Sequence, residues 1–92
     1  MLPLSHMVPA ALAVLLRTTP LSDGKVEFAW RTVVGPAIER ATRVKLDRGV
    51  LIVETTSAQW AREVRRSSAM ILRRLQNFLG TDTVTSISVH KG

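Results

Sequence analysis

The sequence predicts an α+β fold in which helices cover one face of a three-stranded sheet. Residues 57–79 form the longest stretch with apolar side chains at helical spacing. Three shorter stretches, residues 42–47, 50–55 and 84–90, have the alternating or β-branched pattern that is typical of strands. Because a strand, a helix and a strand in succession form a right-handed crossover, we expect the third strand to run parallel to the second. The predicted order is α-α-β-β-α-β, and the pattern leaves open which strand is central.

The 92 residues are expected to form one domain, residues 8–92, after a disordered segment at residues 1–7. The apolar run at residues 8–16 predicts a first helix. It is too short to span a membrane, and it lacks the preceding basic residue of a secretory signal peptide. A second helix is predicted to begin at Ser22 or Asp23. Gly35 interrupts it, so that residues 36–41 continue as a kinked extra turn.

The helix at residues 57–79 is predicted to be continuous. Thr56 fits the first position of a capping box, and Ser57 is the competing cap. Trp60 lies on the apolar stripe of this helix, as Trp30 does in the second helix. Both indoles are therefore predicted to lie in the core.

The strands at residues 42–47 and 50–55 are predicted to form a hairpin. Residues 47–49 read as a three-residue loop with Gly49 in the left-handed conformation. Alternation along the strands assigns one set of side chains to the helices, namely Val44, Leu46, Leu51 and Val53. The opposite face is expected to carry Arg43, Lys45, Val50, Ile52 and Glu54.

The sequence contains no motif for catalysis or for cofactor binding. It has no cysteine, which suits a reducing cytoplasm, and neither His6 nor His90 is next to a carboxylate. The acidic residues are scattered singly, no serine lies in a nucleophile-elbow motif, and no glycine-rich phosphate loop is present. We therefore expect a cytoplasmic protein that is not an enzyme and that uses no metal, cofactor, membrane or small-molecule substrate.

The charge balance indicates a polyanionic or acidic partner, because thirteen basic and seven acidic residues give a net charge of +6. On the helix at residues 57–79, a set of arginines lies away from the apolar stripe and is predicted to bind nucleic acid: Arg62, Arg65, Arg66, Arg73 and Arg74. The open face of the sheet is the predicted docking surface for a protein partner, through Arg43, Lys45, Val50 and Ile52. The alternative for the arginines is a solvated helix face without a partner.

Several short motifs resemble those of a known family. They are Ala29-Trp30, Val33-Val34-Gly35, Gly49-Val50-Leu51-Ile52-Val53, Ser57-Ala58-Gln59-Trp60-Ala61 and Leu79-Gly80. In this combination, over residues 21–89, the sequence resembles the DciA-like family of bacterial proteins. The resemblance implies a KH-like domain that assists loading of the replicative DNA helicase and binds DNA without nucleotide hydrolysis. The sequence has no Gly-x-x-Gly loop, so the backbone clamp of a KH domain is not expected.

The expected function is that of a non-enzymatic module that binds DNA and the replicative DNA helicase. On one straight helix, Arg62 and Arg73 would lie about 16 Å apart along the axis, which matches about two phosphate spacings on an extended single strand. Single-stranded DNA is therefore the expected form. Two alternatives stay open. One is an RNA-binding KH-like module, and the other is an adaptor whose arginines meet an acidic surface of another protein.

Overall fold

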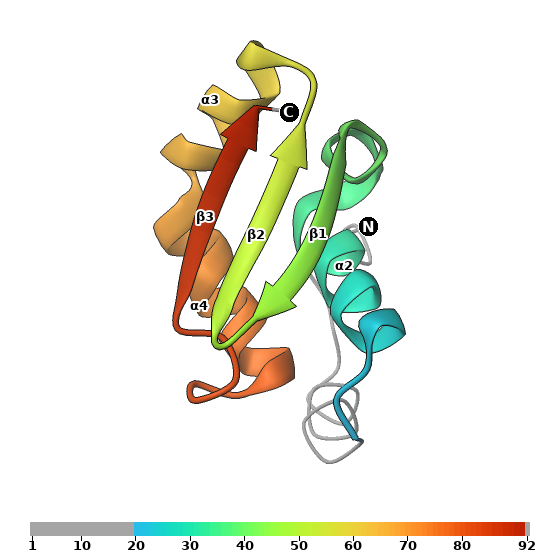
Figure 1. Ribbon diagram of the computed structural model, residues 1–92, viewed down its shortest axis with the longest axis vertical. Helices are drawn as coiled ribbons and strands as arrows, with labels where there is room; N and C mark the ends of the chain where they lie inside the picture. Colours follow the sequence, from blue (N-terminus) through green and yellow to red (C-terminus); the bar gives the residue numbers. More distant parts are fainter. Residues whose placement is uncertain (1–19, 92) are drawn as a thin grey trace, which may run out of the picture.

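Figure 1 shows the computed structural model of the chain, of which residues 20–91 are described. In this part the elements follow in the order α2 (Asp23–Ala41), β1 (Thr42–Asp47), β2 (Val50–Thr55), α3 (Ala58–Arg66), α4 (Ser68–Leu79) and β3 (Ser86–Lys91). The α+β class is confirmed, since these helices lie on one face of a three-stranded sheet (Figure 1). The helix predicted at residues 8–16 and the segment 1–7 lie outside the described residues.

Helix α2 contains the kink that its sequence predicts. Ser22 is the N-cap, and its Oγ accepts a hydrogen bond from the backbone N–H of Lys25 at 3.1 Å. Gly35 has a φ of +82°, which takes the chain out of the helical conformation, and Pro36 begins the extra turn. This turn brings the half-buried Ile38 against the core.

The β1–β2 hairpin has the predicted strand limits and a shorter loop than predicted. Asp47 pairs with Val50, so that Arg48 and Gly49 alone form the loop. Both have positive φ values, +50° and +85°, as a type I′ turn requires. The predicted left-handed conformation of Gly49 is confirmed, whereas the prediction of a three-residue loop is wrong. A type I′ turn matches the twist of the strands, and Asp47 therefore stays in the ladder.

Strand β2 is central, and β3 pairs with it in parallel, as the crossover rule predicts. The pairing of the strands places the predicted inward side chains next to one another. Val44 is opposite Val53, and Leu51 is beside Ile87. Strand β3 begins at Ser86, so the predicted start at Val84 is wrong. Val84 is instead fully buried in the preceding loop, where its carbonyl accepts a hydrogen bond from Nε2 of Gln76 at 2.9 Å.

The long helix predicted from the sequence is in fact two helices, α3 and α4, which meet at Ser67. Ser67 has φ −96° and ψ 6°, values outside the α-helical range. Two successive serines, Ser67 and Ser68, favour such a break because their hydroxyls compete for backbone hydrogen bonds. The break allows α3 to pack on β2 and β3 while α4 packs on α2. Ser57 caps α3, since its Oγ accepts from the backbone N–H of Trp60 at 3.2 Å, and the Thr56 cap is wrong.

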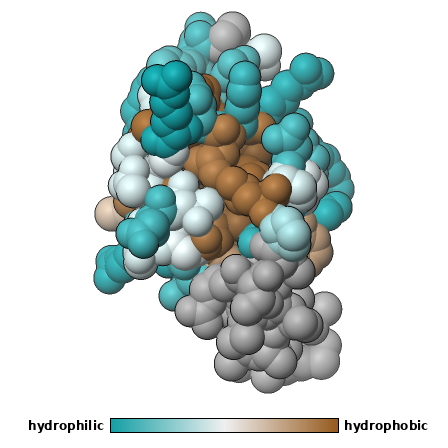
Figure 2. Space-filling model, turned by 60° about the horizontal axis from the view of Figure 1, so that its bottom comes forward, coloured by the Kyte–Doolittle hydropathy of each residue, from teal (hydrophilic) through white to brown (hydrophobic). Residues whose placement is uncertain are grey.

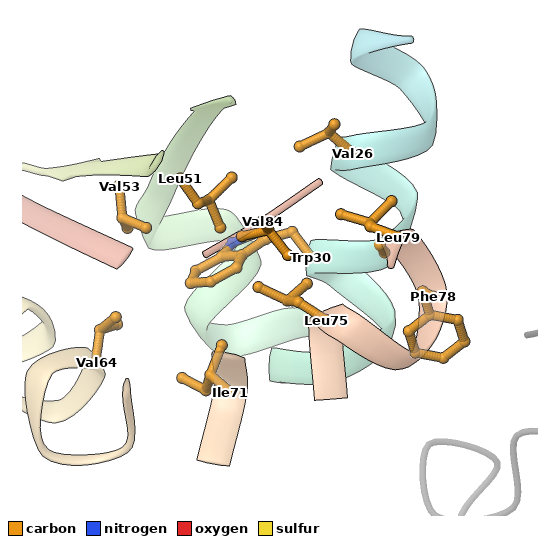
Figure 3. Close-up of a cluster of buried hydrophobic side chains, with 11 residues drawn as sticks. Val26, Trp30, Leu51, Val53, Val64, Ile71, Leu75, Phe78, Leu79 and Val84 are labelled. Carbon is orange, nitrogen blue, oxygen red and sulfur yellow. The ribbon is translucent and has the colours of Figure 1, made fainter. Parts of the chain in front are cut away.

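Trp30 lies in the hydrophobic core beside Leu75 and Val84 (Figure 3). Its side chain is 2% exposed, and the prediction that this indole lies in the core is confirmed. The other large members of the core come from all six elements except β1 and β3: Val26, Leu51, Val53, Val64, Ile71, Phe78 and Leu79.

Trp60 is half-buried and is not part of this core, so the prediction of a buried indole is wrong. Ala61 and Val64 are the buried residues of α3 and define its inward side. Trp60 is displaced from Ala61 by about 100° around the helix axis, which turns it toward the margin of the packed face.

Candidate nucleic-acid interface

All five arginines of the predicted nucleic-acid site are exposed, but they lie on two helices instead of one. We call this set the arginine ridge: Arg62, Arg65 and Arg66 on α3, and Arg73 and Arg74 on α4. The two helices follow one another along the same side of the sheet (Figure 1). Because the helix is interrupted at Ser67, the 16 Å span expected for a straight helix does not apply. The prediction that the arginines form a single straight row is therefore wrong.

Two members of the ridge have partners within the protein. Nη2 of Arg66 lies 3.3 Å from Oε1 of Glu63, in an ion pair whose side chains are 68% and 42% exposed. Nη2 of Arg65 donates a hydrogen bond to the carbonyl oxygen of Val89 at 3.1 Å, on the edge strand β3. An exposed ion pair contributes little to stability, so Arg66 can exchange its carboxylate partner for a phosphate at small cost. Arg65 instead connects α3 to the sheet.

The other three members, Arg62, Arg73 and Arg74, make no ion pair or hydrogen bond to any residue within 20–91. A guanidinium group offers several N–H donors in one plane and suits two oxygens of a phosphate. These three side chains are therefore the most available anion-binding groups of the ridge.

The junction between α3 and α4 consists of Ser67 alone. In a KH domain a Gly-x-x-Gly loop binds the nucleic-acid backbone. A junction of one residue offers no comparable loop between α3 and α4.

The opposite face of the sheet carries no helix in the part of the chain that the structure describes (Figure 1). The register places its outward side chains in three cross-strand rows: Arg43, Glu54 and His90; Lys45, Ile52 and Ser88; Asp47, Val50 and Ser86. Ile52 lies at the centre of this open sheet face, and Val50 is its apolar neighbour on β2. Both are half-buried, while Arg43 and Lys45 are exposed beside them. The four residues predicted to dock a partner thus share one surface.

Strand β3 adds Ser88 and His90 to the open sheet face, and the sequence prediction did not include these two residues among those that dock a partner. Oγ of Ser88 and Nε2 of His90 are 2.8 Å apart, and Glu54 stands beside His90 in the parallel register. The alternation along β3 already indicated that Ser88 and His90 point outward. Only the position of β2 between the other strands puts them next to Ile52 and Glu54 and gives the face a polar border.

Among residues 20–91, no group of three or more His, Cys, Asp or Glu side chains is arranged to hold a metal ion. None of the helices in this range is both long and apolar enough to cross a membrane.

Comparison with known proteins identifies the family of the chain. The family described as Dna[CI] antecedent, DciA, matches residues 3–89. The UPF0232 protein of Mycolicibacterium smegmatis is 33% identical over 70 residues, which cover 75% of this chain and 36% of that protein. The UPF0232 protein of Mycobacterium tuberculosis H37Rv is 34% identical over 70 residues, or 75% of this chain and 37% of the relative.

The aligned region thus covers little more than a third of the length of these mycobacterial relatives. No solved structure matches the chain significantly. The family match extends over nearly all the described residues, including both helices of the arginine ridge, β1, β2 and all but the last two residues of β3. The chain belongs to the DciA family.

Proposed function

We propose that this chain is a non-enzymatic binding module that contacts DNA through the arginine ridge and the replicative DNA helicase through the open sheet face, and so assists helicase loading. The exposure of all five ridge arginines on one helical layer is the observation that carries the DNA contact. Membership of the DciA family supports the helicase-related role. The two surfaces belong to opposite sides of the sheet, so the proposal assigns them separate partners.

Single-stranded DNA is the proposed nucleic acid. Arg62 and Arg66 lie one helical turn apart, about 6 Å along the axis, which allows contact with neighbouring phosphates of one flexible strand. A single strand can also follow the change of helix at Ser67, which a stiff duplex does less readily. The chain has only four aromatic residues, counting tryptophan and phenylalanine, so base stacking is expected to contribute little and salt to weaken binding strongly.

The DNA contact is tested by charge reversal at two unpaired ridge positions, Arg62→Glu with Arg73→Glu. A matched double variant, Arg31→Glu with Arg40→Glu, changes the net charge equally on α2. The ridge variant should bind a labelled single strand more weakly and flatten the plot of log K against log salt by about two units, since each lost phosphate contact contributes close to one. The α2 variant should keep its slope. Equal effects of the two double variants would contradict a localised site.

The open sheet face is the proposed helicase contact because it combines a partly apolar centre with charged surroundings. Such a composition is common at protein interfaces, where apolar side chains form the centre and polar groups the rim. The half-buried Ile52 is the central anchor, with Val50 beside it and Lys45 as the nearest charge. A substitution at the centre should therefore affect helicase binding more than one elsewhere.

The helicase contact is tested by a pull-down with the full chain after nuclease treatment, comparing Ile52→Asp with Met70→Asp. Met70 is 46% exposed on α4, so it provides the same apolar-to-acidic change away from the sheet. Circular dichroism confirms that each variant is folded. The proposal predicts loss of the helicase with Ile52→Asp and retention with Met70→Asp. Retention by both, or loss with the ridge variant alone, would refute the assignment of this face.

Competition separates the proposal from the two alternatives. If RNA displaces the labelled DNA strand at a lower concentration than unlabelled DNA does, an RNA-binding module is indicated. If neither nucleic acid binds measurably while a protein partner does, the arginine ridge contacts an acidic protein surface.

A further inference from the structure

The outer edge of β1 is bordered by a groove that lies apart from the arginine ridge and shares only Arg43 and Lys45 with the open sheet face. A hollow of about 460 Å³ lies between α2 and the first half of the strand, lined by Glu27, Trp30, Glu39, Thr42, Arg43 and Val44. A second hollow of about 230 Å³ lies beside the second half, lined by Asp23, Val26, Glu27, Val44, Lys45 and Leu46. Glu27 and Val44 line both hollows, which are therefore neighbours along the strand, and we call the two together the groove.

The backbone of β1 has unpaired groups along this groove. The type I′ turn makes Asp47 and Val50 a hydrogen-bonded pair, and such pairs alternate along an antiparallel ladder. Lys45 therefore bonds to β2, while the N–H and C=O groups of Val44 and Leu46 point away from it. No hydrogen bond joins these groups to any other residue between positions 20 and 91. An unpaired edge of this kind can accept an additional strand.

The opposite edge of the sheet differs, because a side chain already occupies part of it. Arg65 donates to the carbonyl oxygen of Val89 on β3. An added strand is therefore more readily accepted at β1 than at β3.

The groove has an apolar floor and acidic walls, although the chain as a whole is basic. Val26 and Trp30 are buried at its base, and Val44 and Leu46 are half-buried beside them. Figure 2 shows apolar surface between hydrophilic residues at the end of the molecule where α2 begins. Three carboxylates line the groove, and none has an ion pair with a residue in the described range: Asp23, Glu27 and Glu39. A lysine or arginine side chain fits this combination, with its alkyl part on the floor and its charge at the wall.

The spacing of the hollows matches the repeat of an extended peptide. From β1, the first hollow is lined by residues 42–44 and the second by residues 44–46, so the two are offset by two residues along the strand. Side chains at positions i and i+2 of a strand point to the same face and lie about 6.6 Å apart. The intervening side chains would lie beside the exposed Arg43 and Lys45, where further basic residues are repelled.

We propose that the groove between α2 and β1 binds an extended peptide that pairs with β1 as a fourth strand and places lysine or arginine at two alternate positions into the two hollows. The occupant is a basic segment of another protein. This inference goes beyond the proposed function, and Glu27 belongs neither to the arginine ridge nor to the open sheet face.

The proposal is tested with two heptapeptides of identical composition, Gly-Thr-Lys-Thr-Lys-Thr-Gly and Gly-Thr-Thr-Lys-Lys-Thr-Gly, acetylated and amidated. Adjacent lysines point to opposite faces of a strand, so the second peptide can fill one hollow only. Titration of the isotope-labelled chain should shift the amide signals of Val44 and Leu46 and slow their hydrogen exchange. The alternating peptide should bind at least about threefold more tightly than its isomer.

Reversing the charge of Glu27 then tests whether the carboxylates of the groove bind the lysine side chains of the peptide. Glu27→Lys should weaken binding of the alternating peptide by roughly fivefold or more, because Glu27 lines both hollows. Asp82→Lys makes the same change at an exposed site away from the groove and should have less than about a twofold effect. If Glu27→Lys perturbs α2, Glu27→Gln supplies the same comparison with the shape preserved. Single-stranded DNA binding of the Glu27 variants should not fall, which separates this site from the ridge.

Several results would overturn the proposal. They are equal affinity for the two peptides, equal losses with Glu27→Lys and Asp82→Lys, or peptide-induced shifts that leave Val44 and Leu46 unchanged. Concentration-dependent shifts at Val44 and Leu46 in the chain alone would show that the edge instead pairs with a second copy.

Discussion

Nε1 of Trp30 donates a hydrogen bond to Oγ1 of Thr42 at 2.9 Å, and so joins the buried indole of α2 to the first residue of β1. The Thr42 hydroxyl in turn donates to the carbonyl oxygen of Ile38 at 2.7 Å. One hydroxyl thus satisfies a core N–H group and a carbonyl at the end of the same helix. The contact fixes the corner at which the chain passes from the kinked helix into the sheet.

Thr42→Val should destabilise the fold because it removes the acceptor of a buried indole N–H while keeping the size of the side chain. The expected cost is about 1–3 kcal/mol in the free energy of unfolding, measured by urea denaturation. Thr42→Ser keeps the hydroxyl and should cost less. Equal losses in the two variants would show that the methyl group, and not the hydrogen bond, is important.

Gly49→Val should be more destabilising than Gly49→Asn. The φ of +85° disfavours a β-branched residue, whereas asparagine adopts positive φ at smaller cost. A Cβ at this position would also lie 3.0 Å from Oγ1 of Thr85, so that neither variant should be neutral. Thermal unfolding of the two variants and the parent provides the ranking. If valine were tolerated as well as asparagine, the left-handed turn would be refuted.

Arg48→Asn should stabilise the hairpin. Arg48 occupies the first central position of the type I′ turn with φ +50°, a position at which Asn before Gly is strongly preferred. Because asparagine is less strained there, the gain is expected to be about 0.5–1 kcal/mol. The comparison with Arg48→Ala, which should be neutral or slightly destabilising, controls for the lost charge.

Trp60→Ala should cost less stability than Trp30→Ala. Trp30 is 2% exposed, and its truncation should cost roughly 3–5 kcal/mol. Trp60 is half-buried and outside the core, so about 1–3 kcal/mol is expected. Both values come from denaturant unfolding. Loss of DNA or helicase binding in a Trp60 variant with an unchanged melting temperature would identify the indole as a contact residue.

Much of the sheet could be predicted from the sequence because local patterns determine it. Alternating apolar residues set the limits of β1 and β2, and Gly49 marks their turn. The choice of the central strand could not be predicted in this way. It depends on which edge of the hairpin β3 joins, and that pairing brings together residues far apart in the sequence.

The break in the long helix was not predicted, because the spacing of the apolar residues on either side of Ser67 is compatible with one continuous helix as well as with two separate helices. One residue outside the helical conformation, Ser67, is enough to end α3 and begin α4, and it divides the arginines between two helices. The identities of the arginines and their exposure were predicted, whereas their division between two helices and the hydrogen bond of Arg65 to β3 were not. The acidic groove beside β1 was also not predicted, because it combines residues of α2 with residues of a strand.

The parallel pairing of β2 with β3 also has a consequence for synthesis on the ribosome. The β1–β2 hairpin and its contacts with α2 are local and can form as soon as Thr55 has emerged. The other edge of β2 has no strand to pair with until translation has reached Lys91, a delay on the order of seconds. During that interval Leu51 and Val53 lack their neighbours on β3, and the nascent hairpin exposes an open edge to which a chaperone or another nascent chain could attach.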